Sequence, residues 1–280
     1  YTTYGFTYDG NFMRDKWDKA YLGASLGFFN DKAGDANLGI TQVDLAISSG
    51  IQLNSYNWLA VGVQGGFAQR SIDNASFEWG NQYGAGGFDP SAASGETMNF
   101  EPFNYMDVSA GLAWMYDKNA GTLSSNDALM FRAGVAMYHI NQPEQMMFSQ
   151  EDKLASKIIG YFSGRIGIRN TNMELRPMVM YANQNPAQEI VAGLLARYRL
   201  KEASKVTGNI KEQAIYFGTY FRVGDALIPT LRYEYAGFQL GVSYDVNISS
   251  LSVVSRGRGG FEVNLGYRLV TGTGSARLIN

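Results

Sequence analysis

Apolar and polar residues alternate along most of this chain, and the pattern is clearest near its C-terminal end. In 261–269 every second residue is apolar, and the residues between them are Glu262, Asn264, Gly266 and Arg268. The preceding segment, 238–246, repeats the pattern. A period of two is typical of a β-strand with one apolar and one polar face. A soluble sheet would turn the polar face to bulk water, whereas a membrane barrel would turn the apolar face to lipid and the polar face to a lumen.

The same alternation predicts eleven further strands, at 4–8, 20–28, 43–51, 58–67, 106–116, 129–138, 158–169, 174–181, 190–199, 214–222 and 227–235. Between them, 141–156 is the one region that has room for a short helix. The longest break is 68–104, which is rich in glycine and aromatic residues. A loop of that length inside a compact domain is usually functional.

Thirteen strands of roughly ten residues exceed most soluble sheets and match the ~9–11 residues that a tilted strand needs to cross a bilayer. No apolar run approaches the ~18 residues of a membrane helix. Only 17% of the residues are charged, against roughly 25% in soluble domains. We therefore expect an all-β fold, a transmembrane up-and-down antiparallel β-barrel in a single domain, 1–280. A soluble β-sandwich or solenoid is the alternative.

Connection lengths predict the orientation of this barrel. Links after odd-numbered strands total roughly 40 residues and links after even-numbered strands roughly 80, and barrels place their long loops outside the cell. We expect extracellular long loops, including 68–104, a periplasmic C-terminus and a bacterial outer-membrane location. Strand one then runs inward, so an unseen N-terminal strand should precede it and make fourteen. Because the chain opens inside a strand-like run at Tyr1, we interpret it as the ordered part of a processed, exported protein.

Charge and composition exclude several function classes. The net charge of −2 does not suggest nucleic acid as a partner. The absence of cysteine removes thiolate chemistry, and His139 alone does not make a zinc centre. Asn30, Asp31 and Asp35 lack the calcium-loop pattern. We expect no metal, no cofactor and no enzymatic activity; an outer-membrane hydrolase that uses inward carboxylates such as Glu234 and Glu262 is a minor alternative.

Arginines gather on the polar side of the later strands. Those taken as candidate partner-binding residues are Arg165, Arg169, Arg176, Arg197, Arg199 and Arg232, and Arg132 and Arg268 share the polar side. They either form internal ion pairs that rigidify the barrel, or they form a basic wall that receives an acidic segment of a partner through guanidinium forks. On the second interpretation, replacing Arg165, Arg197 and Arg199 with glutamine leaves the barrel folded and weakens partner capture.

The long loop carries the second group of candidates. Trp79, Tyr83 and Phe88 are large aromatic residues that are costly to leave loose in water. We expect the loop to be either a plug folded into the lumen or an exposed platform for a partner.

Three segments in order resemble one family. They are the run from Asn30 and Asp31 to Gly34, the loop passage 77–96, and the run from Tyr244, Asp245 and Asn247 to Gly260, Phe261 and Glu262. Over nearly the whole chain the sequence resembles the PorP/SprF proteins of Bacteroidetes. The resemblance implies an outer-membrane barrel of the type IX secretion and gliding motility system, which serves export and cell surface attachment of cargo such as adhesins with a type B C-terminal domain.

The same resemblance implies the partners: the cargo's C-terminal domain, periplasmic lipoprotein components of the secretion system, or both. The alternative function is an outer-membrane channel or transporter for a small or apolar solute. A transporter should have an open or gated lumen, whereas an anchor should have a filled lumen or a partner on its loops.

Overall fold

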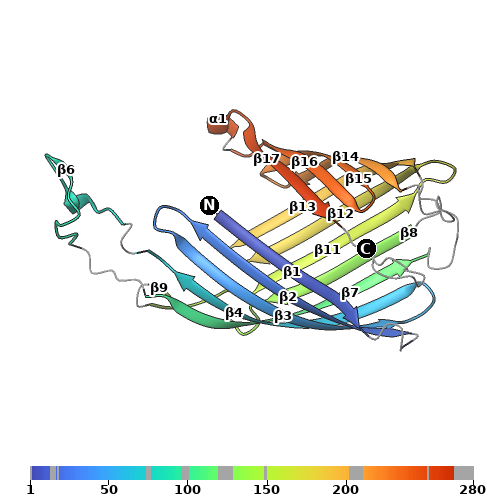
Figure 1. The fold of residues 1–280 in the computed structure, drawn as a ribbon, viewed down its shortest axis with the longest axis horizontal. Coiled ribbons are helices and arrows are strands. Elements are labelled where there is room, and N and C mark those ends of the chain that lie inside the picture. Colours follow the sequence, from blue (N-terminus) through green and yellow to red (C-terminus); the bar gives the residue numbers. More distant parts are fainter. Residues whose placement is uncertain are drawn as a thin grey trace. The chain divides into compact units, whose positions relative to one another are not determined.

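The computed structural model describes residues 2–12, 17, 19–73, 77–95, 101–118, 129–147, 150–201, 211–250 and 252–267. Thirteen strands form one antiparallel sheet whose order follows the sequence, as the colours from blue to red in Figure 1 show. The strands are β1 (Thr2–Phe12), β2 (Ala20–Ala33), β3 (Leu38–Gln52), β4 (Asn57–Ser71), β7 (Phe103–Asp117), β8 (Leu129–Tyr138), β11 (Lys157–Gly167), β12 (Met173–Gln184), β13 (Ala187–Lys201), β14 (Gln213–Arg222), β15 (Ala226–Tyr235), β16 (Phe238–Asn247) and β17 (Arg258–Tyr267). Among the described residues, β1 and β17 are the outer strands of this order.

Each of the thirteen strands predicted from the alternation is present, and most are longer than predicted. The short helix considered for 141–156 is wrong for the described part of that region, which contains the antiparallel pair β9 (Glu144–Met147) and β10 (Gln150–Lys153). The loop predicted at 68–104 is shorter, because β4 continues to Ser71 and β7 begins at Phe103. Within it lie the 3-10 turn η2 (Gly80–Gln82) and the small hairpin of β5 (Tyr83–Gly84) and β6 (Gly87–Phe88). Residues 74–76 and 96–100 of this loop lie outside the described residues.

The contacts divide the chain into two compact units. Unit 1 contains 1–51, 60–111 and 136–157, and unit 2 contains 52–59, 112–135 and 158–280. A buried apolar cluster in unit 2 consists of Leu195, Ala214 and Tyr216, with Tyr220 packed against it. A search of the described residues finds no helix with the length and apolarity needed to cross a membrane.

The two faces of the strands differ in the way that the alternation predicts. On β15 the apolar residues Leu231, Tyr233 and Tyr235 are exposed, whereas Arg232 and Glu234 between them are half-buried. On β17 Leu265 is 75% exposed, while Arg197 on β13 is only 3% exposed. A soluble protein would bury the first residue and expose the second. The sheet therefore has an exposed apolar face and a face on which charges are buried.

An arginine-lined cavity as the candidate functional site

Strand register brings charged residues of unit 2 into one row. Arg197 stands beside Glu174 on β12 and beside Tyr216 on β14, and Tyr216 stands beside Arg232 on β15. Residues directly opposite each other on paired strands point to the same face. The row therefore crosses four strands on the polar face, although its members are far apart in the sequence.

Glu174 stands at the β12 end of this row and is 2% exposed. Arg165 on β11 binds it with two hydrogen bonds, Nε to Oε2 and Nη2 to Oε1, each 2.9 Å long. Arg197 and Arg199 also donate to Oε1, at 3.2 and 3.1 Å, and Arg176 donates to Oε2 at 3.3 Å. One buried carboxylate thus binds four guanidinium groups, and this arrangement offsets the cost of burying its charge.

Tyr216 forms the second contact point of the network. Its hydroxyl group accepts a hydrogen bond from Arg197 Nε at 2.9 Å and donates one to Glu234 Oε2 at 2.5 Å. The guanidinium carbons of Arg176, Arg197 and Arg232 lie 5.2, 5.5 and 5.6 Å from the centre of its ring. These distances fit cation–π contacts, so a single phenol ring holds three arginines in place.

Two residues of this network were not found by sequence reasoning. Glu212 precedes β14 and binds Arg197 Nη2 at 2.6 Å and Arg199 Nε at 3.4 Å. Tyr216 was missed because the alternation is less regular in 214–222, so no polar side was assigned there. The signal was in β14, where Ala214, Tyr216, Gly218, Tyr220 and Arg222 occupy the less exposed alternate positions while Phe217 and Phe221 are exposed.

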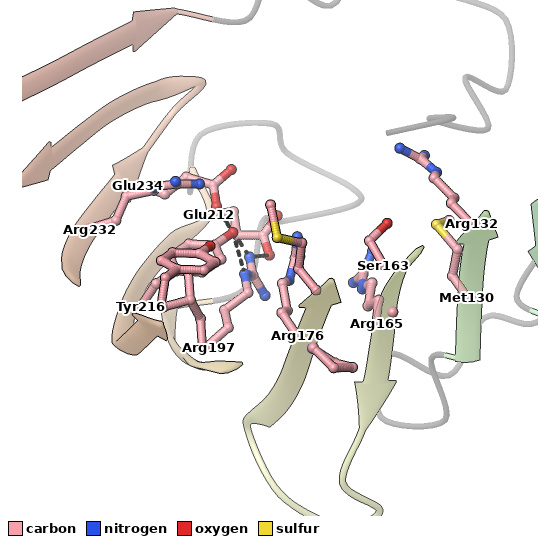
Figure 2. Close-up of a pocket in the computed structure, with 15 residues that line it drawn as sticks. Met130, Arg132, Ser163, Arg165, Arg176, Arg197, Glu212, Tyr216, Arg232 and Glu234 are labelled. Atoms are coloured by element: carbon pink, nitrogen blue, oxygen red, sulfur yellow. Dashed lines mark hydrogen bonds and ion pairs between the residues drawn. The ribbon is translucent and has the colours of Figure 1, made fainter. Parts of the chain in front are cut away.

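Beside the network lies a cavity of about 350 Å³. Figure 2 shows that its side chains come from successive strands, with Arg232 and Glu234 at one side and Arg132 and Met130 at the other. The charged residues that line it are Arg132, Arg165, Arg176, Arg197, Arg232, Glu212 and Glu234. Arginines outnumber carboxylates in this lining, so the chemistry that the cavity supports best is the binding of an anion.

The structure separates the predicted arginines into three kinds. Arg165, Arg197 and Arg199 are held by Glu174, as the ion-pair interpretation requires. Arg176 and Arg232 line the cavity beside Tyr216, as Arg165 and Arg197 also do, and Arg176 has only one contact with Glu174, at 3.3 Å. Arg169 was predicted on the same wall but does not line the cavity, because β11 ends at Gly167 and Arg169 lies exposed in the following turn. Arg268 lies outside the described residues.

This geometry changes what the glutamine substitutions should do. The sequence suggested that replacing Arg165, Arg197 and Arg199 would leave the barrel folded. Removing three partners of a buried carboxylate leaves that charge uncompensated, which is strongly destabilising. We now expect the triple variant to lose stability, so Arg176 and Arg232 are the better residues for testing partner binding.

The long-loop candidates lie in a segment that is ordered by its own hydrogen bonds. The buried Gln82 side chain accepts from Trp79 N at 3.0 Å and donates to Ala92 O at 3.1 Å. The rings of Tyr83 and Phe88 pack 5.3 Å apart, and both residues are exposed. The hydrogen bond from the Tyr83 hydroxyl group to Glu78 raises the pKa of Tyr83. The loop therefore presents an aromatic pair on a stable support.

The positions that carry the family resemblance are mostly structural. Asn30 Nδ2 donates to Thr41 Oγ1 at 2.7 Å, Asp31 accepts from Thr3, and Gly34 has a positive φ of 69° in the turn that follows. These contacts join neighbouring strands at the end of β2. Positive φ is a conformation that glycine adopts without strain.

The second motif forms the connection between β16 and β17. Asp245 binds Arg222 at 3.3 Å, and the Asn247 side chain accepts from the Ser249 backbone at 2.9 Å and donates to Ser255 at 3.2 Å. The short helix α1 (Ser252–Ser255) follows. Tyr244 pairs with Phe261 and Ser243 with Glu262 across the two strands, and Gly260 lies between Gly259 and Phe261 in β17.

A further polar contact lies in unit 1, where His139 Nδ1 is 3.0 Å from the buried Asp107 carboxylate. Within the described ranges, no group of three or more His, Asp or Glu side chains is placed to hold a metal ion.

Comparison with known proteins identifies the family of the chain. The family model for the type IX secretion system membrane protein PorP/SprF matches residues 1–267. A search of curated proteins finds no match. The matched region includes every described strand and all three segments on which the resemblance depends. The chain therefore belongs to the PorP/SprF family of type IX secretion system membrane proteins.

Proposed function

We propose that this protein is a non-enzymatic outer-membrane β-barrel that anchors a secreted surface protein or assists its export through the type IX secretion system. The family supports a role in secretion. The main observation in support of a barrel is the difference between the two faces of the sheet. One face exposes apolar residues such as Leu231 and Leu265, and the other contains buried charges such as Glu174. In a bilayer the first face meets lipid and the second lines the interior.

Closure into a barrel of fourteen strands belongs to this proposal. A barrel leaves no strand edge unpaired in lipid, and bacterial single-chain barrels have an even number of strands. The strand that would complete the thirteen in the sheet is expected to stand beside β1.

The orientation follows from the connections. The segment with η2, β5 and β6, the pair β9 and β10, and the segment with α1 all follow even-numbered members of the thirteen-strand order. In bacterial barrels the longer loops face outside. We place these three segments at the cell surface and the C-terminal end of β17 towards the periplasm, where lipoprotein components of the secretion system would meet it.

The loop around Tyr83 and Phe88 is the proposed contact for a partner or a plug. Its internal hydrogen bonds keep the loop ordered, and the exposure of both rings is consistent with a platform for a partner. Deleting 77–96 should raise the conductance of the barrel in planar bilayers if the loop is a plug. Unchanged conductance together with weaker partner capture would exclude the plug and support the platform.

The direct test is co-purification. The tagged barrel is extracted in detergent from cells of its source, and proteins bound to it are identified by mass spectrometry. We expect a secreted protein whose C-terminal domain, expressed alone, also binds the barrel. As a matched control, another outer-membrane barrel with the same tag should not capture it.

A bare barrel with solute-selective conductance would overturn the proposal in favour of a channel or transporter. Normal surface display of the cargo in a strain that lacks the barrel would also contradict it.

A further inference from the structure

We propose that the cavity between β8 and β15 binds carboxylate side chains of an acidic peptide segment, with Arg176 and Arg232 as the residues that hold it. The inference rests on the proposed function, because it names the part of a secreted partner that this site would take. Four properties of the cavity support it: charge, the distribution of ion pairs, rigidity and size.

The charge of the site is unbalanced. Apart from Arg132 and Arg199, which have further interactions, the lining and the network behind it contain four arginines, Arg165, Arg176, Arg197 and Arg232, and three glutamates, Glu174, Glu212 and Glu234. Buried charges are usually neutralised by partners. Within the part of the chain that the structure describes, the site therefore has an excess of positive charge that an anionic ligand would offset.

The ion pairs are concentrated on one side of the site. Glu174 accepts hydrogen bonds from both Nε and Nη2 of Arg165, and Arg197 forms ion pairs with both Glu174 and Glu212. Arg176 has a single contact of 3.3 Å with Glu174, its Nε is buried without a hydrogen-bond partner, and its side chain is 34% exposed. Arg232 contacts the Tyr216 ring, and no described carboxylate lies within ion-pair distance of it.

Arg176 and Arg232 are also held in position before a ligand arrives. Both lie against the ring of Tyr216, whose hydroxyl group is fixed by Arg197 and Glu234. Arg176 lies on β12 and Arg232 on β15, and Figure 2 shows both side chains in the neighbourhood of Tyr216. Preorganised donors lose less side-chain entropy on binding, and a guanidinium fork matches a carboxylate with two hydrogen bonds.

The size and the apolar part of the lining select the ligand. A volume of about 350 Å³ is at the lower end of the range of roughly 300–1,000 Å³ for ligand pockets. It fits one or two side chains rather than a folded domain. Met178, Leu195 and Pro177 contribute apolar surface, which suits the methylene groups of glutamate better than a bare inorganic anion.

The test uses the purified full-length barrel in detergent and a dye-labelled oligoglutamate peptide, with an oligoglutamine peptide of equal length as the uncharged probe. Binding is measured by fluorescence anisotropy at low and at moderate salt. We expect saturable binding of oligoglutamate and none of oligoglutamine. Arg232→Gln should weaken binding about tenfold, because a charge-assisted hydrogen bond is lost, and Arg176→Gln should act in the same direction.

Three controls make the result specific. Arg232→Lys keeps the charge but not the fork, so it should restore binding only partly if two-point contact matters. Arg256→Gln removes the same charge from an exposed position outside the cavity and should bind as the wild type does. Heat-modifiable migration of each variant on a gel shows that the barrel is folded.

The other outcomes overturn either the inference or the proposed function. Equal binding of both peptides, or equal losses in Arg232→Gln and Arg256→Gln, would mean that the cavity is not the site. Competition by inorganic phosphate at the same concentration as the peptide would assign the site to small anions. Cargo that co-purifies with a wild-type barrel that binds no oligoglutamate would refute the inference and leave the proposed function intact. Oligoglutamate binding without any cargo would refute the proposed function instead.

Discussion

Glu174 shows how a single carboxylate organises a large part of the polar face. It is buried and contacts Arg165, Arg176, Arg197 and Arg199. Replacing a buried ion pair by apolar groups can be neutral, but removing one member leaves the other charges uncompensated. The residue is therefore expected to determine stability rather than ligand binding.

Glu174→Gln should lower the free energy of unfolding by about 3–5 kcal/mol, the cost of breaking a buried ion pair. The measurement is the urea midpoint of unfolding of the barrel in lipid vesicles, followed by tryptophan fluorescence. Glu189→Gln is the matched control, because the Glu189 side chain is 46% exposed in its pair with Arg222 and exposed pairs contribute about 0–1 kcal/mol. Equal midpoints for the two variants would contradict the central position of Glu174.

Among the elements, the end of β7 depends on a side chain that acts as a strand partner. Asn141 Oδ1 accepts from Val108 N at 3.0 Å, and Asn141 Nδ2 donates to Met106 O at 2.7 Å. Ile140 N also donates to Val108 O at 2.9 Å. The amide group of Asn141 thus extends the pairing of β7 beyond Tyr138, where β8 ends.

Asn141→Ala should increase the hydrogen exchange rate of the Val108 amide about tenfold, because that amide loses its acceptor. Exchange is measured by mass spectrometry on peptides that cover 103–117. Asn183→Ala is the control, since the Asn183 side chain has only a 3.5 Å contact with Ala187 O. An unchanged rate at Val108 would show that the backbone pairing alone protects this end.

The loop with η2 and β5 is an element of a different kind, because its order depends on Gln82. Gln82→Ala removes both side-chain hydrogen bonds to Trp79 and Ala92. We expect protease cleavage within 77–95 to become several times faster, as measured by the intact fraction over time. Gln188→Ala, an exposed position at the start of β13, should leave the cleavage rate unchanged.

At the scale of the whole molecule, the polarity of the two faces decides in which solvent the sheet is stable. Neighbouring residues on β17 point to opposite faces, and Leu265 is on the apolar one. In a membrane barrel an arginine on the lipid face costs about 2–4 kcal/mol near the middle of the bilayer, whereas lumen positions tolerate it.

Leu265→Arg should therefore lower the yield of barrel folded into lipid vesicles, while Asn264→Arg, one residue away, should fold as the wild type does. The folded fraction is measured from heat-modifiable migration on gels. The opposite order of the two variants would place the apolar face in the interior of the protein and refute the membrane barrel.

The sequence by itself determined the thirteen strands and the polarity of their faces. Both follow from a period of two, which is a local property: Leu231 and Arg232 are neighbours, and their side chains must point to opposite faces. Where the local pattern was weak, the prediction was less successful. The sequence left room for a short helix at 141–156, whereas the described part of that segment contains the antiparallel pair β9 and β10.

Only the tertiary structure decided which arginines are neutralised and which line a cavity. On sequence, Arg165, Arg169 and Arg232 were equivalent members of one wall. A side-chain contact between β11 and β12 assigns Arg165 to Glu174, and the register of β14 and β15 places Arg232 beside Tyr216. The end of β11 at Gly167 places Arg169 in an exposed turn. Charge pairing depends on contacts between residues far apart in the chain. The sequence pattern predicts the face of the sheet on which each side chain lies, but it does not predict which residues that side chain contacts.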